Sequence, residues 1–185
     1  MPSDRTTDLT GTLVAVLIAP QGTEEAEFTE PKKALESAGA IPVVVSLSGG
    51  EAQTRNHDLE PGGGYPVDRT LDDVTPDDVA AVVIPGGTVG ADRLRADEAV
   101  VRFVRGVADQ GKPVAAICHG PSTLIEAGLA SGRRLTSFPS LQTDLRNAGA
   151  QWVDEEVVVD GGVITSRNPG DLDAFCSALL DALAG

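Results

Sequence analysis

Four short runs of apolar and β-branched residues stand out along the chain. Polar residues do not alternate within them, which is typical of parallel strands that are covered by helices on both faces. The runs that predict strands are Leu13–Ala19, Ile41–Leu47, Ala80–Ile84 and Pro113–Ile117.

Helix-like stretches lie between these runs. Phe28–Ala38 ends at Gly39, and Asp97–Gln110 ends at Gly111. Glycine is favoured just past a helix C-terminus, where the backbone turns left-handed. Strands and helices therefore alternate, and this order predicts an α/β fold with a doubly wound, mostly parallel sheet and helices on both faces.

The segment Ser48–Asp73 departs from this alternation. It is rich in Gly, Pro, Asp and Asn, with Gly62-Gly63-Gly64 at its centre. We predict a loop here, with a small hairpin at the edge of the sheet.

Near the C-terminus the pattern predicts a β-hairpin. Glu155–Val159 and Val163–Ser166 flank Asp160-Gly161-Gly162, a strong turn signal. Asp171–Leu183 follows with apolar positions at helical spacing. Cys176 lies in this apolar stretch and is expected to pack rather than react.

Composition narrows the class of protein. The 185 residues show no repeat or linker and suffice for one domain with its own core, so a single domain over residues 1–185 is predicted. The 28 acidic and 14 basic residues give a net charge of -14, which argues against binding to nucleic acid or to anionic membranes. Two cysteines are too few for a disulfide framework and match no metal-binding spacing.

The sequence also bears on location. The segment Met1–Thr10 is polar and acidic, unlike a signal peptide. No apolar run approaches the ~20 residues needed to span a bilayer. A cytoplasmic location is therefore expected.

The most informative segment surrounds Cys118. A buried strand is predicted to stop at this cysteine and a helix to start at once, with Pro121 in its first turn. So sharp a turn crowds the residues two positions away, and these are the small Ala116 and Gly120. This is the logic of a nucleophile elbow, with a thiol over a helix N-terminus that favours thiolate. The alternative is an inert cysteine that ends a core strand.

Two histidines are available to such a cysteine. His119 is the obvious candidate base, although neighbours at an elbow need not face each other, and a surface or interface histidine is the alternative. His57 lies in the Gly-rich segment and is expected to be solvated. The chain has no His-x-Glu pair after the elbow, which argues against the triad of a glutamine amidotransferase.

Two further groups follow predicted strands, at the sheet edge where ligands gather. In Pro85-Gly86-Gly87, glycine allows close approach to a ligand, and the Gly87 amide could help to form an oxyanion hole; a plain turn is the alternative. One carboxyl of Glu24, Glu25 and Glu27 could reach Cys118, while the other two would be solvated at an acidic helix start.

At these residues the sequence resembles the ThiJ/PfpI superfamily, specifically its PfpI-type branch of stress-associated proteins. The matching motifs run nearly end to end: GTEEAEFTEP, VIPGG, AAICHGP and TSFPSLQTDLRNAGAQWVDEEVVVDGGVITSRNPGDL. The resemblance implies a flavodoxin-like sandwich, related to class I glutamine amidotransferases, and assembly into a homodimer or homohexamer.

The resemblance also implies roles for particular residues. Cys118 would be the nucleophile, His119 its partner and Glu27 a protonated carboxyl that hydrogen-bonds the thiolate. The amides of Gly87 and His119 would form the oxyanion hole. Asp92 is the best match to an acidic residue that reaches the cysteine–histidine pair from a neighbouring subunit. No cofactor or metal is implied.

Relatives of this type are known as proteases, as glyoxalases acting on methylglyoxal without a cofactor, and as deglycases that repair early glycation adducts of proteins and nucleotides. We expect a cysteine enzyme acting on small dicarbonyls or such adducts: the thiolate would form a hemithioacetal, His119 would shuttle protons, and water would release a hydroxy acid. An intracellular cysteine peptidase is the second hypothesis. A redox sensor or chaperone without turnover is the third, because an accessible thiolate oxidises readily to sulfinic acid.

Overall fold

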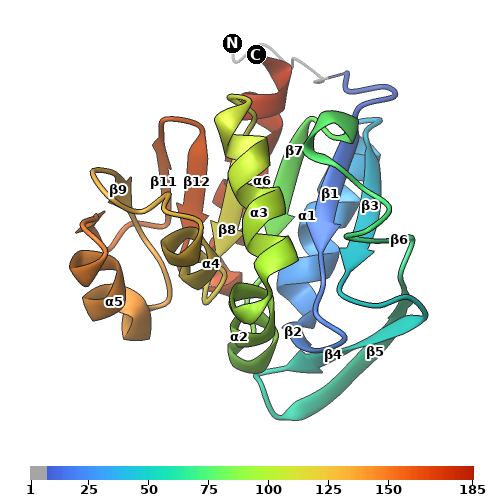
Figure 1. Ribbon diagram of the computed structural model, residues 1–185, viewed down its shortest axis with the longest axis horizontal. Helices are drawn as coiled ribbons and strands as arrows, with labels where there is room; N and C mark the ends of the chain where they lie inside the picture. The colour runs from blue at the N-terminus through green and yellow to red at the C-terminus, as the bar shows by residue number, and fades with distance from the viewer. Residues whose placement is uncertain (1–7) are drawn as a thin grey trace.

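The computed structural model describes residues 8–185, and its centre is a mostly parallel sheet (Figure 1). Seven strands of the described chain form it, and only the pair β11–β12 runs antiparallel. In spatial order they are β11 (Val157–Asp160), β12 (Val163–Ser166), β8 (Val114–Ile117), β7 (Ala81–Ile84), β1 (Leu13–Leu17), β3 (Ile41–Ser46) and β6 (Arg69–Thr70).

Helices cover both faces of this sheet. Helices α1 (Glu25–Ser37) and α6 (Leu172–Ala184) pack on one face, while α2 (Thr88–Ala96), α3 (Glu98–Asp109) and α4 (Pro121–Glu126) cover the other (Figure 1). Successive strand residues point to opposite faces, so Val14 and Val16 join the core under α1 and α6, whereas Ala15 and Leu17 join the core under α3. The predicted flavodoxin-like α/β fold is confirmed.

The predicted strands and helices appear within a few residues of their expected ends. Helices α1 and α3 also end as the glycine signals indicate, since Gly39 and Gly111 both have a positive φ. Helix α3 starts at the side chain of Asp97, which accepts hydrogen bonds from the Ala99 and Val100 amides. The C-terminal hairpin is confirmed as β11 and β12, with Gly161 and Gly162 in its turn.

The interpretation of Ser48–Asp73 is only partly correct. A hairpin does form, from β4 (Glu51–Asn56) and β5 (Glu60–Pro66), but it pairs with β2 (Gln21–Glu24) in a separate three-stranded sheet. The glycine triplet lies within β5 and not in a loop. A side chain at Gly62 would lie 2.3 Å from Thr54 Oγ1, so these glycines permit close approach of the strands.

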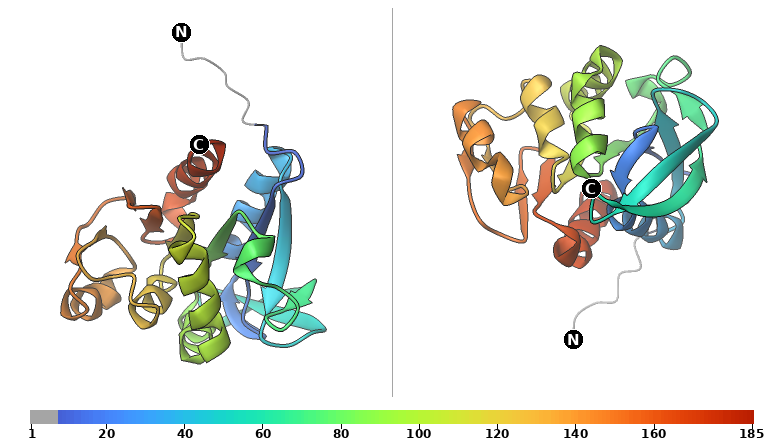
Figure 2. Two further views of the ribbon diagram at one scale, coloured as in Figure 1. Left: turned by 45° about the horizontal axis from the view of Figure 1, so that its top comes forward. Right: turned by 90° about the horizontal axis from the view of Figure 1, so that it is seen from below.

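Smaller elements complete the described chain. Strands β9 (Arg134–Leu135) and β10 (Gln151–Trp152) pair beside α5 (Gln142–Asn147), and short 3₁₀ turns occur at Pro76–Asp78, Pro139–Leu141 and Pro169–Asp171. Figure 2 shows the α5 segment and the β4–β5 hairpin at opposite ends of the molecule. None of the helices within residues 8–185 is long and apolar enough to cross a membrane. The expectation for Met1–Thr10 falls mostly outside the described residues.

Candidate active site

Cys118 lies in a sharp turn between β8 and α4, as predicted. Its φ of 63° is left-handed, which is unusual for a residue with a side chain. The turn is held by hydrogen bonds from the Cys118 amide to Ser166 O (3.0 Å) and from the Gly120 amide to Ile117 O (2.8 Å). A Cβ on Gly120 would lie only 2.4 Å from Ile84 O, so the crowding expected at this position is real.

His119 does face its neighbour in sequence. Its Nδ1 lies 3.3 Å from Cys118 Sγ, its Nε2 lies 3.3 Å from Ser140 Oγ, and its ring stacks on Phe138 at 4.6 Å between centroids. Burial lowers the pKa of His119, and the negative charge of Asp58 opposes this shift. The imidazole is therefore neutral near pH 7 and free to accept a proton.

Glu27 provides a carboxyl group in the interior beside the thiol. It is fully buried, and its Oε2 accepts a hydrogen bond of 2.8 Å from the Gly86 amide, while Oε1 has no partner among the hydrogen bonds of the described residues. Burial raises the pKa of Glu27 to about 8, although contacts with Cys118 and Gly86 oppose the shift. The carboxyl group therefore holds its proton at neutral pH.

The thiol is less readily ionised than the helix N-terminus alone suggests. Cys118 is 6% exposed, and burial raises the pKa of its thiol, as does the negative charge that Glu27 carries once ionised. The backbone amides of Gly87 and His119 contact the sulfur and lower its pKa. The backbone amides therefore favour the thiolate, as expected, but burial has the larger influence on the pKa of this thiol.

The glycine pair after β7 allows this close packing. A Cβ on Gly86 would lie 2.5 Å from Glu27 Oε2 and 2.8 Å from Cys118 Cβ. Gly87 has a φ of 82° and precedes the first residue of α2, so its amide stands at a helix N-terminus. The Gly87 and His119 amides thus meet at the sulfur, where the predicted oxyanion hole would be.

Of the three candidate glutamates, Glu27 is the one that reaches Cys118. The expectation that the other two are solvated is wrong for Glu24, whereas Glu25 stays partly exposed. Glu24 is 8% exposed and its Oε1 accepts a hydrogen bond of 3.2 Å from the His57 amide. Glu25 accepts hydrogen bonds from the Gly63 amide (2.7 Å) and from Tyr65 Oη (2.8 Å), because the hairpin folds back over the start of α1.

The tip of the β4–β5 hairpin also belongs to the site. His57 and Asp58 both have positive φ values, 52° and 65°. Asp58 fixes the tip to helix α2, since its carboxylate oxygens accept hydrogen bonds from the amide (2.7 Å) and the hydroxyl (2.9 Å) of Thr88. His57 is exposed as predicted, yet it lines the cavity above Cys118.

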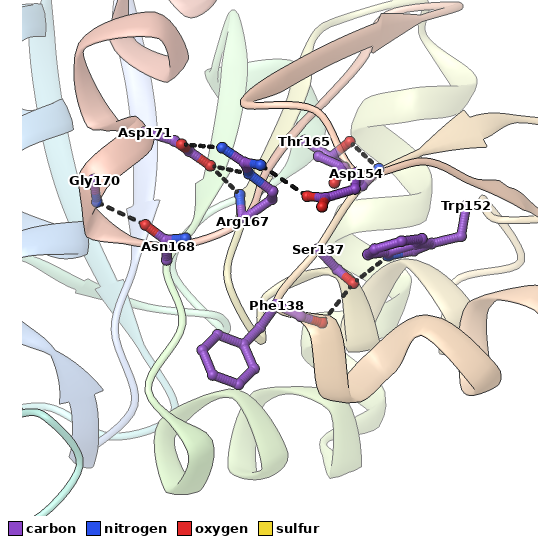
Figure 3. A network of polar contacts seen from close by, with 10 residues as sticks. Ser137, Phe138, Trp152, Asp154, Thr165, Arg167, Asn168, Gly170 and Asp171 are labelled. Atoms are coloured by element: carbon purple, nitrogen blue, oxygen red, sulfur yellow. Dashed lines mark hydrogen bonds and ion pairs between the residues drawn. The ribbon is translucent and has the colours of Figure 1, made fainter.

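A tight turn after β12 forms another wall. Figure 3 shows the Arg167 guanidinium between Asp154 and Asp171, with Nε 2.9 Å from Asp171 Oδ2 and Nη1 2.7 Å from Asp154 Oδ1. Asn168 Oδ1 accepts a hydrogen bond of 2.9 Å from the Gly170 amide within the same turn. These contacts hold Pro169 at the edge of the cavity.

The cavity around Cys118 has a volume of about 330 Å³. Its lining residues come from the carboxyl ends of strands and from the hairpin tip: Glu24, Glu27, His57, Asp58, Gly87, Cys118, His119, Phe138 and Pro169. Sequence reasoning missed Asp58, Phe138 and Pro169 as members, named Glu24 only as one of three candidate carboxyls, and expected His57 to be solvated. The one available signal was the Asn56-His57-Asp58 stretch, whose residue types tolerate the left-handed conformation of a turn.

Asp92 does not join this cavity within one chain. It is exposed on α2 and lines a second cavity of about 470 Å³, which also includes His119 and Ser140. An approach from a neighbouring subunit therefore stays a prediction.

Cys176 is half-buried on α6, and burial raises the pKa of its thiol to about 11. Residues 8–185 contain no cluster of three or more His, Cys, Asp or Glu side chains that could hold a metal ion.

Comparisons with known proteins agree with this geometry. The model of the DJ-1/PfpI family matches residues 12–182. The chain belongs to the DJ-1/PfpI family. It is similar to YraA of Bacillus subtilis, whose name assigns it provisionally to the cysteine proteases, with 41% identity over 170 residues (92% of this chain and 97% of YraA).

Two further relatives support the same assignment. Deglycase PfpI of Pyrococcus furiosus is 42% identical over 152 residues, or 82% of this chain and 88% of that protein. The crystal structure of Drosophila melanogaster DJ-1beta superposes with a TM-score of 0.85 at 35% identity, covering 95% of this chain and 92% of that one. The chain is thus a cysteine-based enzyme of the DJ-1/PfpI family.

Proposed function

We propose that this enzyme removes reactive dicarbonyls or their early glycation adducts, with Cys118 as nucleophile and His119 as general base. The observation that carries the proposal is the approach of Cys118 Sγ to His119 Nδ1, 3.3 Å, inside a cavity that also holds a buried carboxyl group. A volume of about 330 Å³ suits a small carbonyl compound or a single modified side chain. The name of the Pyrococcus furiosus relative points to the same chemistry.

The hydrogen-bond donors around the two groups favour a charge on the sulfur of Cys118 over a charge on Glu27. A thiolate would receive the Gly87 and His119 amides and the proton of Glu27, whereas a Glu27 carboxylate would receive the Gly86 amide and a weak S–H donor. Sulfur is also the less buried of the two groups. Because Glu27 still holds its proton at neutral pH, it would be able to donate that proton to a thiolate that forms beside it.

The chemistry can be written for methylglyoxal. The thiolate adds to the aldehyde carbon, a C–S bond forms, and the carbonyl electrons move to oxygen, next to the Gly87 and His119 amides. His119 removes the hydrogen of that carbon as a proton, and the adjacent ketone carbon is protonated in its place, which leaves a thioester. Water then hydrolyses the thioester to lactate and restores the thiol, so that one water is consumed and no oxidant is needed. With an amine adduct, the C–N bond breaks and the amine leaves with a proton.

The test is a parallel panel on the wild type, Cys118→Ala and Cys176→Ser. We expect lactate formation from methylglyoxal and release of amine from a glycated peptide, both reduced by a factor on the order of 10³ or more in Cys118→Ala. Cys176→Ser removes the other thiol and should retain activity. Turnover that survives Cys118→Ala contradicts the proposal.

The same panel separates the other two hypotheses. Cleavage of casein that depends on Cys118, without lactate formation, would instead identify a peptidase. Selective oxidation of Cys118 to sulfinic acid by mild peroxide, without turnover of any substrate, would identify a redox sensor.

A further inference from the structure

The cavity above Cys118 carries acidic side chains and no fixed cation. Glu24, Glu27 and Asp58 line it, and none of its lining residues, all within the described chain, is Lys or Arg. Arg167 lies next to this wall in sequence, but its guanidinium forms ion pairs with Asp154 and Asp171. The two imidazoles, His57 and His119, are the only lining side chains that could become cationic.

The acidic groups are fixed in place by hydrogen bonds. Asp58 accepts two of them from Thr88 at the start of α2, and Glu24 accepts one from the His57 amide at the hairpin tip. The negative charges of Glu24 and Asp58 act inside the cavity, because both raise the pKa of Glu27. Glu24 and Asp58 therefore add a negative contribution to the electrostatic potential inside the cavity, and the low-dielectric walls of a small cavity strengthen such a field.

We infer that the Cys118 cavity discriminates by charge: it admits neutral and cationic carbonyl compounds and excludes anionic ones, with Asp58 and Glu24 as the residues that set this preference. Uncharged dicarbonyls and adducts carried by ammonium or guanidinium side chains fit the preference. Small α-oxo acids and phosphorylated trioses do not. This inference rests on the proposed function, since it names the class of substrate that reaches the same thiol.

The experiment measures charge selection at Cys118 without requiring turnover. Methanethiosulfonate reagents react with a thiolate so that a new S–S bond forms, the S–S bond of the reagent breaks and methanesulfinate leaves. The cationic trimethylammonium-ethyl, the anionic sulfonatoethyl and the neutral methyl reagents are compared on Cys176→Ser protein, in which Cys118 is the remaining thiol. Each charged rate is divided by the neutral rate, so that changes in access or in thiolate fraction cancel.

We expect the cation-to-anion ratio at Cys118 to exceed the ratio for the neutral model thiol N-acetylcysteine amide by about tenfold or more. Asp58→Asn and Glu24→Gln each remove the charge and keep one oxygen that can accept a hydrogen bond, and each should lower the ratio about threefold. Asp77→Asn removes the same charge from the turn before β7, which lies at the amino ends of the strands and away from the cavity. This control should leave the ratio unchanged. A ratio equal to that of the model thiol, or an equal response to Asp77→Asn, overturns the inference.

Steady-state assays then separate this inference from the proposed function. Neutral methylglyoxal is compared with the anionic aldehyde glyoxylate on the wild type and Asp58→Asn. A high reagent ratio without turnover of methylglyoxal would contradict the proposed function and leave the charge preference standing. Turnover of methylglyoxal together with a cation-to-anion ratio equal to that of the model thiol would support the proposed function and overturn the charge preference.

Discussion

At the scale of single residues, Glu27 is a carboxyl group kept from water beside a thiol. Its pKa is 4.5 in a solvated chain and about 8 in the fold, with burial as the main cause. Between these two pH values, Glu27 has released its carboxyl proton in the unfolded chain but still holds it in the folded chain. Folding stability therefore falls as the pH rises from about 4.5 to about 8, and at pH 7 the loss is roughly 3 kcal/mol.

Glu27→Gln should remove most of this loss. The amide oxygen can accept from the Gly86 amide as Oε2 does, and the uncharged amide costs less to bury than a carboxylate. We expect the variant to gain roughly 2 kcal/mol over the wild type at pH 7, and little at pH 4.5, by urea denaturation at both values. Glu30→Gln, an exposed change on the same helix, is the control and should stay within about 0.5 kcal/mol. A difference between Glu27→Gln and the wild type that does not depend on pH would contradict this account.

At the scale of elements, the turn from β8 to α4 depends on two neighbouring strands as well as on its own residues. The Cys118 amide donates to Ser166 O at the end of β12, and the space at Gly120 is closed by Ile84 O at the end of β7. The left-handed Cys118 is therefore held from both sides of its strand. A rigid support of this kind keeps the Cys118 side chain in one orientation, as the proposed role of a nucleophile requires.

Gly120→Ala should loosen this turn. Its Cβ would lie 2.4 Å from Ile84 O and 2.9 Å from Ile117 O, and both are backbone atoms that cannot move aside as a side chain would. We expect a loss of about 1–3 kcal/mol in urea denaturation, together with a fall in kcat. Gly49→Ala is the matched control, because no atom lies within 4 Å of the added Cβ, and it should be nearly neutral. Equal stability of the two variants would show that the turn tolerates a side chain.

At the scale of the whole molecule, the charge balance opposes folding. Even if every basic residue paired with an acidic one, the 28 acidic and 14 basic residues would leave 14 carboxylates without partners. Self-repulsion of this kind destabilises a compact state, and salt screens it because the Debye length falls from about 30 Å at 0.01 M to below 10 Å at physiological ionic strength.

We therefore expect Tm to rise as NaCl increases from about 0.01 M to about 0.5 M at neutral pH. A gain of about 1 kcal/mol corresponds to roughly 3 °C for a chain of this size, measurable by differential scanning calorimetry. KCl should have the same effect, since screening depends on ionic strength and not on the ion. A Tm that falls or stays constant in both salts would argue against repulsion as a major cost.

Prediction from sequence succeeded where local pattern and covalent geometry decide the outcome. Apolar runs predicted the four central strands, and Gly39 and Gly111 predicted helix ends, because these signals act within a few residues. The elbow at Cys118 was predicted for the same reason. Helix α2 and the short pair β9–β10 were not predicted, since nine-residue and two-residue elements depend on packing against their neighbours.

The sequence by itself determined the α/β order, the cysteine at a strand–helix turn and the acidic character of the chain, because each follows from residue type and spacing. Only the tertiary structure decided which carboxyl group lies buried at the thiol and that the hairpin tip closes the cavity. It also decided that the pKa of Cys118 is raised and not lowered. These properties depend on burial and on approach between segments as distant as Glu24, Asp58 and Pro169, and no local pattern encodes them.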